Sequence, residues 1–343
     1  MIGCANRHPQ TAYPMIADQI ATAKTIDFCQ LEGWAEDDHS AALAVFLGSS
    51  DLLTGRQWAE ISKLGHDAVQ SRAASKQFFE AQFSPTLIGY GPAMFTGYYE
   101  PELQASPFPT QRFAYPIYAK PPELGQDDVW HRRDMIENTG ALRGRGLELA
   151  WLDNPVDVFF LMVQGSGRLL MPDGSRVRVG FGGKNNQPYT SLGQAMIARG
   201  LLTVENASAQ TIRAWLHENP ALGADLMNCN PSFVFFKILP DVPDERGPIG
   251  TMGRSVTALR SIAVDPEFTP LGIPVWVEKG GQNPMRALMI AQDTGGAIKG
   301  AQRADIFYGT GASAGDAAGA VKDSGRMVLL LPKSRPALLV GGG

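Results

Sequence analysis

The sequence is poor in the residues that build metal centres and disulfide frameworks. Its 343 residues include three cysteines and five histidines. Cys4, Cys29 and Cys229 form no C-x-x-C pair, and the histidines form no H-E-x-x-H motif. Those motifs are the usual signs of a zinc site, and an odd number of cysteines does not suit a disulfide framework. We therefore expect no metal, no cofactor and at most one disulfide.

Basic charge is scarce as well. The 30 Lys and Arg against 34 Asp and Glu give a formal net charge of −4, whereas nucleic-acid-binding proteins favour a basic stripe. We expect no nucleic-acid partner. No apolar run reaches the length that spans a membrane. The 38 glycines and 24 prolines separate short apolar runs in the C-terminal half, which indicates a β-barrel rather than a helical bundle.

The most informative stretch runs from Ala287 to Gly311 and reads A-L-M-I-A-Q-D-T-G-G-A-I-K-G-A-Q-R-A-D-I-F-Y-G-T-G. Its first residues predict a buried strand that delivers Asp293 to a Gly-rich turn, and Asp305 begins a second β-prone run. A carboxyl group beside aromatic rings and a second carboxylate has a raised pKa, so Asp305 is a candidate proton donor. Aspartates beside glycines also cap turns, and spacing alone leaves both interpretations open.

This stretch resembles the C-terminal 3D domain of the membrane-bound lytic murein transglycosylase A family, which is named after three aspartates. They would be Asp265, Asp293 and Asp305 here. Three further motifs agree in the same order: F-T-G-Y-Y-E-P at 95–101, V-Q-G-S-G at 163–167 and N-P-S-F-V-F-F-K at 230–237. The resemblance runs from about Phe95 nearly to the C-terminus.

The resemblance implies a mainly β fold with some α structure. A double-psi β-barrel domain with N-terminal helices is interrupted by an inserted β-rich domain, and a groove lies between the two. The expected boundaries are 1–100 and 241–343 for the catalytic domain and 101–240 for the insert. The residue patterns predict helices at 34–53, 56–83, 191–201, 209–218 and about 314–321. They predict strands at 113–118, 158–163, 232–239, 261–264, 273–277, 287–290, 306–308 and 327–331.

The resemblance also implies the reaction, which is cleavage of the β-1,4 bond between N-acetylmuramic acid and N-acetylglucosamine in peptidoglycan. One carboxyl group suffices, because the C6 hydroxyl of the muramic acid attacks its own anomeric carbon and leaves a 1,6-anhydromuramoyl end. Ordinary glycosidases use two carboxyl groups. Asp305 would be the general acid and base, Asp293 a supporting group and Asp265 a structural one.

Candidate sugar contacts lie near these motifs, because sugars bind to aromatic platforms and hydrogen-bonding side chains. Strand alternation points the two adjacent tyrosines to opposite faces, so one is expected in a core and the other in the cleft. For the polar candidates an ordinary role in turns is an equally good explanation. A cation such as Lys299 or Arg303 beside Asp305 would lower its pKa. The candidates are Thr96, Tyr98, Tyr99, Gln164, Ser166, Lys184, Asn185 and Lys299.

Two other functions stay open. A hydrolysing glycosidase would use Asp293 and Asp305 as a pair, and a non-catalytic cell-wall carbohydrate-binding protein would use the same barrel. The implied partner is the peptidoglycan glycan strand, and a wall-remodelling complex is left open.

The chain begins M-I-G-C-A-N, without the basic and apolar leader of an exported protein. Ile2-Gly3-Cys4 resembles the end of a bacterial lipoprotein signal, and members of the family are typically outer-membrane lipoproteins. An acylated Cys4 would place the protein at the periplasmic face of the outer membrane. That interpretation requires that the chain starts late; otherwise Cys4 is an ordinary thiol, and the protein is expected in the periplasm.

Overall fold

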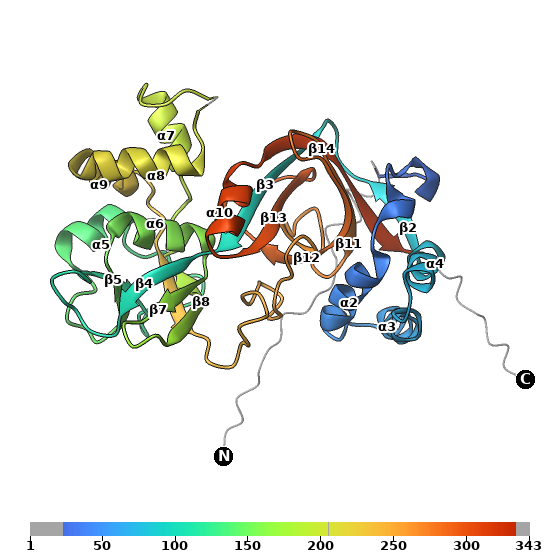
Figure 1. Cartoon of the computed structure of the whole chain (residues 1–343), viewed down its shortest axis with the longest axis horizontal. Coiled ribbons are helices and arrows are strands. Elements are labelled where there is room, and N and C mark those ends of the chain that lie inside the picture. Colours follow the sequence, from blue (N-terminus) through green and yellow to red (C-terminus); the bar gives the residue numbers. More distant parts are fainter. Residues whose placement is uncertain (1–22, 205, 334–343) are drawn as a thin grey trace, which may run out of the picture.

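The larger of two β-sheets closes on itself. The computed structural model describes residues 23–204 and 206–333 (Figure 1). The larger sheet has the strand order β1-β2-β14-β11-β12-β10-β13-β3, and a further pairing of β14 with β3 closes its last six strands into a barrel. A barrel leaves no unpaired edge among those strands. The strands are β1 (Lys24–Thr25), β2 (Phe83–Leu87), β3 (Ala93–Glu100), β10 (Ser261–Val264), β11 (Pro274–Lys279), β12 (Met285–Thr294), β13 (Arg303–Thr310) and β14 (Lys322–Pro332).

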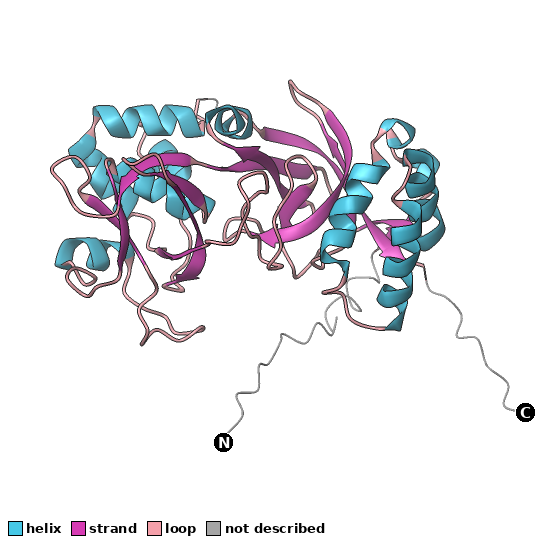
Figure 2. Ribbon diagram, turned by 60° about the horizontal axis from the view of Figure 1, so that its bottom comes forward, coloured by secondary structure: helices cyan, strands magenta, loops and turns pink. Residues whose placement is uncertain are grey.

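Helices cover the outside of this barrel at one end of the molecule (Figure 2). All six residues of β11 are buried, because one face of the strand packs inside the barrel and the other is covered. Phe46 and Phe79 from the helices join Trp276 of β11 in one apolar core. The N-terminal helical elements are η1 (Phe28–Gln30), η2 (Trp34–Glu36), α2 (His39–Ser50), α3 (Arg56–Ala68) and α4 (Arg72–Gln82).

The boundaries of these helices differ from the sequence prediction. The stretch 56–83 is two helices rather than one, because the Ser71 hydroxyl accepts a hydrogen bond from the Ala74 amide at 3.1 Å and starts α4. The preceding helix begins at His39 and not at Trp34, since the carboxylate of Asp38 caps the first free amides of α2. Both breaks are set by N-cap side chains, which satisfy amides that have no partner within the helix.

The second sheet, at the left in Figure 1, has the order β5-β6-β4-β7-β8-β9. Its strands are β4 (Glu102–Ser106), β5 (Tyr115–Tyr118), β6 (Glu148–Leu152), β7 (Gly167–Leu170), β8 (Arg176–Lys184) and β9 (Val234–Ile238). Its helices are α5 (Arg133–Thr139), α6 (Pro155–Gln164), α7 (Leu192–Ala198), α8 (Ala209–Glu218) and α9 (Pro220–Asn228). One further helix, α10 (Ala312–Gly319), packs on β3 and β13 of the barrel. The mainly β fold with a second sheet is confirmed.

One predicted strand is wrong. Residues 158–163 lie inside α6, although their β-branched and aromatic residues favoured a strand. The Asn154 side chain accepts a hydrogen bond from the Val156 amide at 2.8 Å, and Pro155 takes the first helical position, where its missing N–H costs nothing. Gly165 ends the helix in the left-handed conformation, with φ of 78°. Local capping therefore overrides strand propensity here.

The helix at 209–218 is confirmed with both of its predicted ends. The Ser208 hydroxyl accepts a hydrogen bond from the Thr211 amide at 3.1 Å, and α8 stops at Glu218. Pro220, just beyond the end of α8, is the first residue of α9. A proline that cannot continue one helix is well suited to begin the next.

The chain passes between the two sheets at a buried ion-pair cluster. Glu100, at the end of β3, is fully buried and lies 2.9 Å from Nε of Arg168 and 2.8 Å from Nε of Arg178. The Thr310 hydroxyl also donates to Glu100, at 2.8 Å. Arg178 donates to backbone carbonyls at positions 242, 243 and 246, on the returning segment. Both crossings of the chain are therefore tied to one carboxylate, with the additional hydrogen bonds that a buried charge needs.

Two expectations concern the ends of the chain and its cysteines. Cys4 lies outside the described residues, and Cys29 and Cys229 are free thiols. Within residues 23–204 and 206–333, every helix is too short or too polar to cross a membrane.

Candidate functional site

The site is built on one row of residues across four barrel strands. Asp293 of β12 pairs with Ala263 of β10, Ala263 pairs with Asp305 of β13, and Asp305 pairs with Thr96 of β3. The two aspartates follow each other closely in sequence, yet β10 lies between their strands. Strands two places apart are separated by about 9.6 Å. The aspartates therefore share a face of the barrel without lying on neighbouring strands.

Asp305 has the environment of a proton-transfer group. It is half-buried, and its Oδ1 accepts a hydrogen bond from the Thr96 hydroxyl at 2.6 Å. Burial raises the pKa of Asp305 to about 6. The Thr96 hydrogen bond and the charge of Arg303 oppose that rise, and the charge of Asp293 adds to it. A carboxyl group with this pKa both donates and accepts protons near neutral pH.

Asp293 is held very differently. Its Oδ1 accepts from the Thr251 amide at 2.9 Å, the Thr251 hydroxyl at 2.8 Å and the Thr294 amide at 2.9 Å. Its Oδ2 accepts from the Tyr98 hydroxyl at 3.1 Å. Burial raises the pKa of Asp293, while these donors favour the ionised form and oppose the rise. Both oxygens of Asp293 accept hydrogen bonds, so its carboxylate is held in a fixed position on the barrel face that also carries Asp305.

Tyr98 belongs to a small apolar cluster and donates a hydrogen bond to Asp293. Its ring centroid lies 5.1 Å from that of Phe307, and both rings belong to a small core with Val256, Ala263 and Ile298. Burial, with the charges of the two aspartates, raises the pKa of Tyr98 well above its ordinary value. Tyr98 therefore stays protonated and acts as a hydrogen-bond donor.

The two cations whose position the sequence left open are both accounted for. Lys299 is exposed, and its Nζ lies 3.5 Å from Oδ1 of Asp265. Asp265 is almost fully buried and accepts a hydrogen bond from the Gly300 amide at 2.9 Å, so it fixes the Gly-rich loop to the end of β10. Arg303 donates to the Thr96 hydroxyl at 2.8 Å. Thr96 thus lies between Arg303 and Asp305, since its hydroxyl also donates to Asp305.

Of the other predicted sugar contacts, Tyr99 lies on barrel strand β3, and the rest belong to the second sheet and its connections. Tyr99 is half-buried, and its amide donates to Oε1 of Gln164 at 3.0 Å. Lys184 is exposed at the end of β8, whereas Ser166 is buried. Asn185 is fully buried, and its side chain makes hydrogen bonds to the backbone of residues 131, 231, 233 and 187. The structure thus places Thr96 and Tyr98 next to the two aspartates, whereas the side chain of Asn185 is hydrogen-bonded within the inserted domain.

Tyr189 is a site residue that the sequence interpretation missed. It lies between β8 and α7 with 37% of its surface exposed. A Cβ added at Gly296, in the loop that follows Asp293, would lie 3.8 Å from the Cβ of Tyr189. Burial raises the pKa of Tyr189, and the charge of Asp305 adds to that rise. An aromatic residue in the polar run K-N-N-Q-P-Y-T-S was the available signal.

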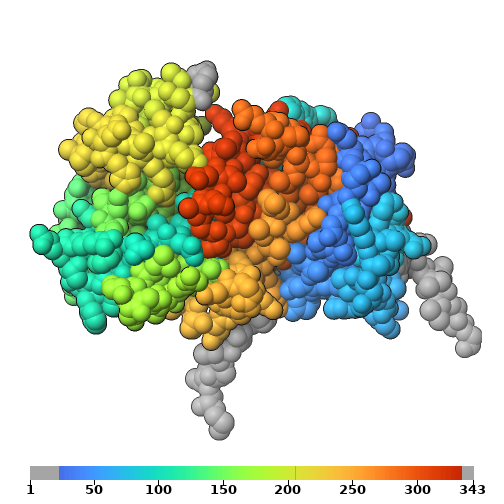
Figure 3. All heavy atoms as spheres, viewed as in Figure 1, coloured from blue at the N-terminus to red at the C-terminus, as the bar shows by residue number. Residues whose placement is uncertain are grey.

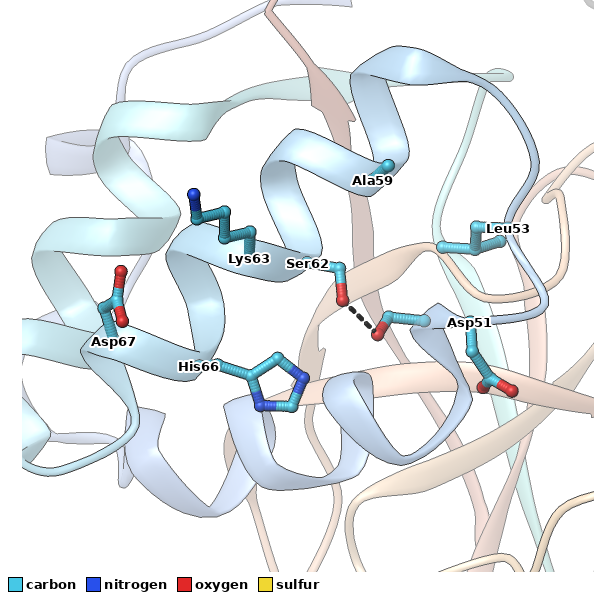
Figure 4. Close-up of a pocket in the computed structure, with 8 residues that line it drawn as sticks. Asp51, Leu53, Ala59, Ser62, Lys63, His66 and Asp67 are labelled. Atoms are coloured by element: carbon cyan, nitrogen blue, oxygen red, sulfur yellow. Dashed lines mark hydrogen bonds between the residues drawn. The ribbon is translucent and has the colours of Figure 1, made fainter.

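Two cavities lie outside this row of residues. The first is bounded by α2, α3 and the turn between them, and its lining includes Lys63, His66 and Asp67 (Figure 4). The second, of about 790 Å³, lies between α2 and residues 244–258 and reaches Phe307. Among the described residues, no three or more His, Cys, Asp or Glu side chains group in a way that could hold a metal ion.

The fold and the candidate site together define a protein of two β-sheets, the larger of which is closed into a barrel that carries Asp293 and Asp305 in one row. Residues 94–237 match the model of the MltA specific insert domain, and residues 260–331 match that of the 3D domain. The chain belongs to the membrane-bound lytic murein transglycosylase A family. The resemblance seen in the sequence is confirmed.

Named relatives and solved structures agree with this membership. The chain is 33% identical to membrane-bound lytic murein transglycosylase A of Vibrio cholerae, over 78% of this chain and 70% of that protein. It is 37% identical to the Escherichia coli protein, over 70% of this chain and 66% of that protein.

Among solved structures, a membrane-bound lytic murein transglycosylase from Agrobacterium tumefaciens superposes with a TM-score of 0.81 at 32% identity, covering 91% of this chain and 98% of that one. E. coli MltA with bound chitohexaose gives 0.72 at 30% identity, covering 86% and 90%. The double-psi barrel fold is thereby confirmed.

Proposed function

We propose that this protein is a lytic transglycosylase that cleaves the β-1,4 bond between N-acetylmuramic acid and N-acetylglucosamine in peptidoglycan. The observation that carries the proposal is the Asp305 carboxyl, which is half-buried, has a pKa raised to about 6 and, within residues 23–204 and 206–333, accepts a side-chain hydrogen bond through Oδ1 alone. Membership of the family supports the reaction. The chitohexaose in the E. coli structure supports glycan strands as the ligand.

Asp305 acts twice in this mechanism. As the acid, it gives its proton to the glycosidic oxygen of the departing N-acetylglucosamine. As the resulting carboxylate, it takes the proton of the muramic acid's C6 hydroxyl while that oxygen attacks the anomeric carbon. No water is consumed, and the product carries a 1,6-anhydro ring. A pKa of about 6 suits a group that must serve in both forms near neutral pH.

The Asp293 environment favours this mechanism over hydrolysis by a carboxylate pair. A glycosidase needs its second carboxylate to attack the sugar or to activate water. Four hydrogen bonds already occupy the oxygens of Asp293. We assign Asp293 to supporting the charge and position of Asp305, and Asp265 to holding the loop that carries Lys299.

We also propose how the chain divides around the substrate. Residues 1–100 and 241–343 form the catalytic domain, and residues 101–240 form the inserted domain, which provides the other wall of the groove. Figure 3 shows the surfaces of these two parts, with α10 in red between them. The exposed candidates Lys184 and Lys299 and the half-buried Tyr99 and Gln164, together with Tyr189, are the proposed contacts with glycan. The name "membrane-bound" of the relatives supports a location at the outer membrane through Cys4.

Mass spectrometry of muropeptides tests the proposal. Purified peptidoglycan is incubated with the wild type and with Asp305→Asn, and the released ends are weighed. We expect anhydromuropeptides from the wild type and at least about a thousandfold less from the variant, which lacks the acid. Products heavier by one water would show a hydrolase. Binding to peptidoglycan without any release would show a wall-binding protein.

A further inference from the structure

We propose that Arg303 and Thr96 form a hydrogen-bond relay that fixes the Asp305 carboxyl so that its Oδ2 carries the transferred proton. The inference rests on the proposed function, and it assigns Arg303 and Thr96 as positioning residues. It also names the oxygen that faces the substrate. Neither the barrel fold nor the identity of the acid determines which of its two oxygens does so.

The direction of each hydrogen bond follows from the chemistry of the donors. A guanidinium has no acceptor, so the 2.8 Å contact between Arg303 Nη2 and Thr96 Oγ1 must be donated by the arginine. The hydroxyl hydrogen of Thr96 is then directed at Asp305 Oδ1, 2.6 Å away. A proton on Oδ1 would reverse this bond and leave the Thr96 hydrogen without an acceptor. The neutral acid therefore carries its proton on Oδ2.

The strands themselves hold the relay in place. In the parallel pairing of β13 with β3, Arg303 lies opposite Met94, and Asp305 lies opposite Thr96. Nη1 of Arg303 donates to the carbonyl of Ala304 at 2.6 Å and to that of Met94 at 3.4 Å. Nη1 thus holds the guanidinium to both strands. Because the guanidinium is planar and rigid, fixing Nη1 also fixes the direction of Nη2, which points at Thr96.

The remaining oxygen of Asp305 is available for substrate. In the part of the chain that the structure describes, Thr96 is the one residue hydrogen-bonded to the Asp305 side chain, through Oδ1. Proton transfer to the glycosidic oxygen leaves from Oδ2, and the proton of the C6 hydroxyl returns to it.

Five titratable groups interact electrostatically with Asp305. Asp293 lies on β12, Arg303 and Tyr308 lie on β13, Tyr98 lies on β3, and Tyr189 lies between β8 and α7. The pKa of each tyrosine is raised, so near neutral pH the charged members of this set are Asp293 and Arg303.

A double-mutant cycle tests the relay. Thr96→Val and Arg303→Met each remove one link, and we expect each to lower kcat about tenfold with little change in KM, because the acid is misaligned while the sugar still binds. The double variant should match Thr96→Val within about twofold, since without the hydroxyl Arg303 has nothing to direct. Thr96→Ser keeps the hydroxyl and should stay within about twofold of the wild type.

Several outcomes would overturn the relay. Independent losses that multiply to about a hundredfold in the double variant would mean that Arg303 acts without Thr96. A Thr96→Ser variant as slow as Thr96→Val would mean that the hydroxyl is irrelevant. Arg326→Met, on β14 and paired with Glu278, is the matched control and should retain full activity. Thermal melting of every variant checks that it is folded.

A second readout separates the relay from the proposed function. The Asp305 carboxyl is titrated by NMR in the wild type, in Thr96→Val and in Thr96→Ser. Loss of the Thr96 hydrogen bond should raise the pKa of Asp305 above about 6, and serine should restore it. An unchanged pKa in Thr96→Val overturns the relay, whether or not the protein cleaves peptidoglycan. A wild type that releases no anhydromuropeptides overturns the function and leaves the titration result standing.

Discussion

The barrel and the inserted sheet use their buried polar side chains in opposite ways. In the barrel, Asp305 is hydrogen-bonded through one oxygen and has a raised pKa. In the insert, Asn185 is fully buried, and its side-chain amide forms hydrogen bonds with the surrounding backbone. Arg133 does the same, donating to the carbonyls of Asn230 and Ser232 at 3.1 and 2.7 Å. Polar residues of similar appearance in sequence therefore belong to the proposed site on one side and hold loops on the other.

The largest expected effect comes from breaking the junction that joins these two regions. Glu100→Ala leaves Arg168 and Arg178 buried without their carboxylate, and we expect a loss of about 4 kcal/mol in the free energy of unfolding. Urea denaturation measures it. Arg176→Ala removes an exposed ion pair with Asp244 nearby and serves as the control, with an expected change below about 1 kcal/mol. Equal losses in the two variants would contradict a buried junction.

A smaller loss is expected within the insert. Asn185→Ala removes hydrogen bonds to four backbone groups and should cost about 3 kcal/mol of stability, because buried partners are left unpaired. The kcat of the folded variant should stay close to that of the wild type. Lys184→Ala, at the exposed neighbour, should leave stability unchanged. A large fall in kcat with normal stability would transfer Asn185 to the substrate groove.

In the barrel the corresponding change should affect chemistry rather than folding. The substitution Asp293→Asn keeps an acceptor for the Thr251 and Thr294 donors. It removes the negative charge that helps to raise the pKa of Asp305. That pKa should fall below about 6, so the acid ionises at lower pH and the alkaline limb of the pH profile moves to lower pH. At neutral pH we expect kcat to drop about tenfold, which corresponds to about 1.4 kcal/mol. An upward shift of that limb would refute the coupling.

The smallest effect concerns His39, a buried polar residue that fits neither pattern. Both of its ring nitrogens lack a hydrogen-bond partner among the described residues, and burial lowers its pKa below the ordinary 6.5. The folded state then binds fewer protons than the unfolded state, so this contribution to stability is present above about pH 6.5 and is lost as pH falls through that value. The loss begins near pH 6.5 and is completed as the pH falls through the lower pKa of the folded state, so unfolding free energies at pH 5 and 7.5 should differ less in His39→Phe than in the wild type. An identical pH dependence in both would show that His39 does not contribute.

The sequence predicted the parts of the fold that depend on local pattern. Short apolar runs marked most barrel strands, with 261–264 confirmed at both ends, and the predicted helix 209–218 agrees with α8 at both ends. Residues 158–163 were misread because the cap at Asn154, outside the apolar run, decides their structure. Strand propensity is weak evidence where a helix cap competes with it.

The candidate site was predictable in its residue types but not in its geometry. Asp293 and Asp305 could be picked out as a pair, yet the insertion of β10 between their strands depends on the closure of the whole barrel. The position of Tyr189 depends on how the second sheet meets the barrel, and the partner of Arg303 depends on the register of β13 with β3. These are long-range properties that no local pattern encodes.

The contact between Thr96 and Asp305 also sets an order of events in time. It joins residues 209 positions apart, and the whole inserted sheet lies between them in the chain. Contacts of such high sequence separation form late, because the entropy of closing a long loop is spent before they are made. The Thr96 hydroxyl can therefore reach Asp305 only after the insert has been synthesised. With Asp305 as the proposed acid, a newly made chain would gain its activity only after this long-range contact has closed.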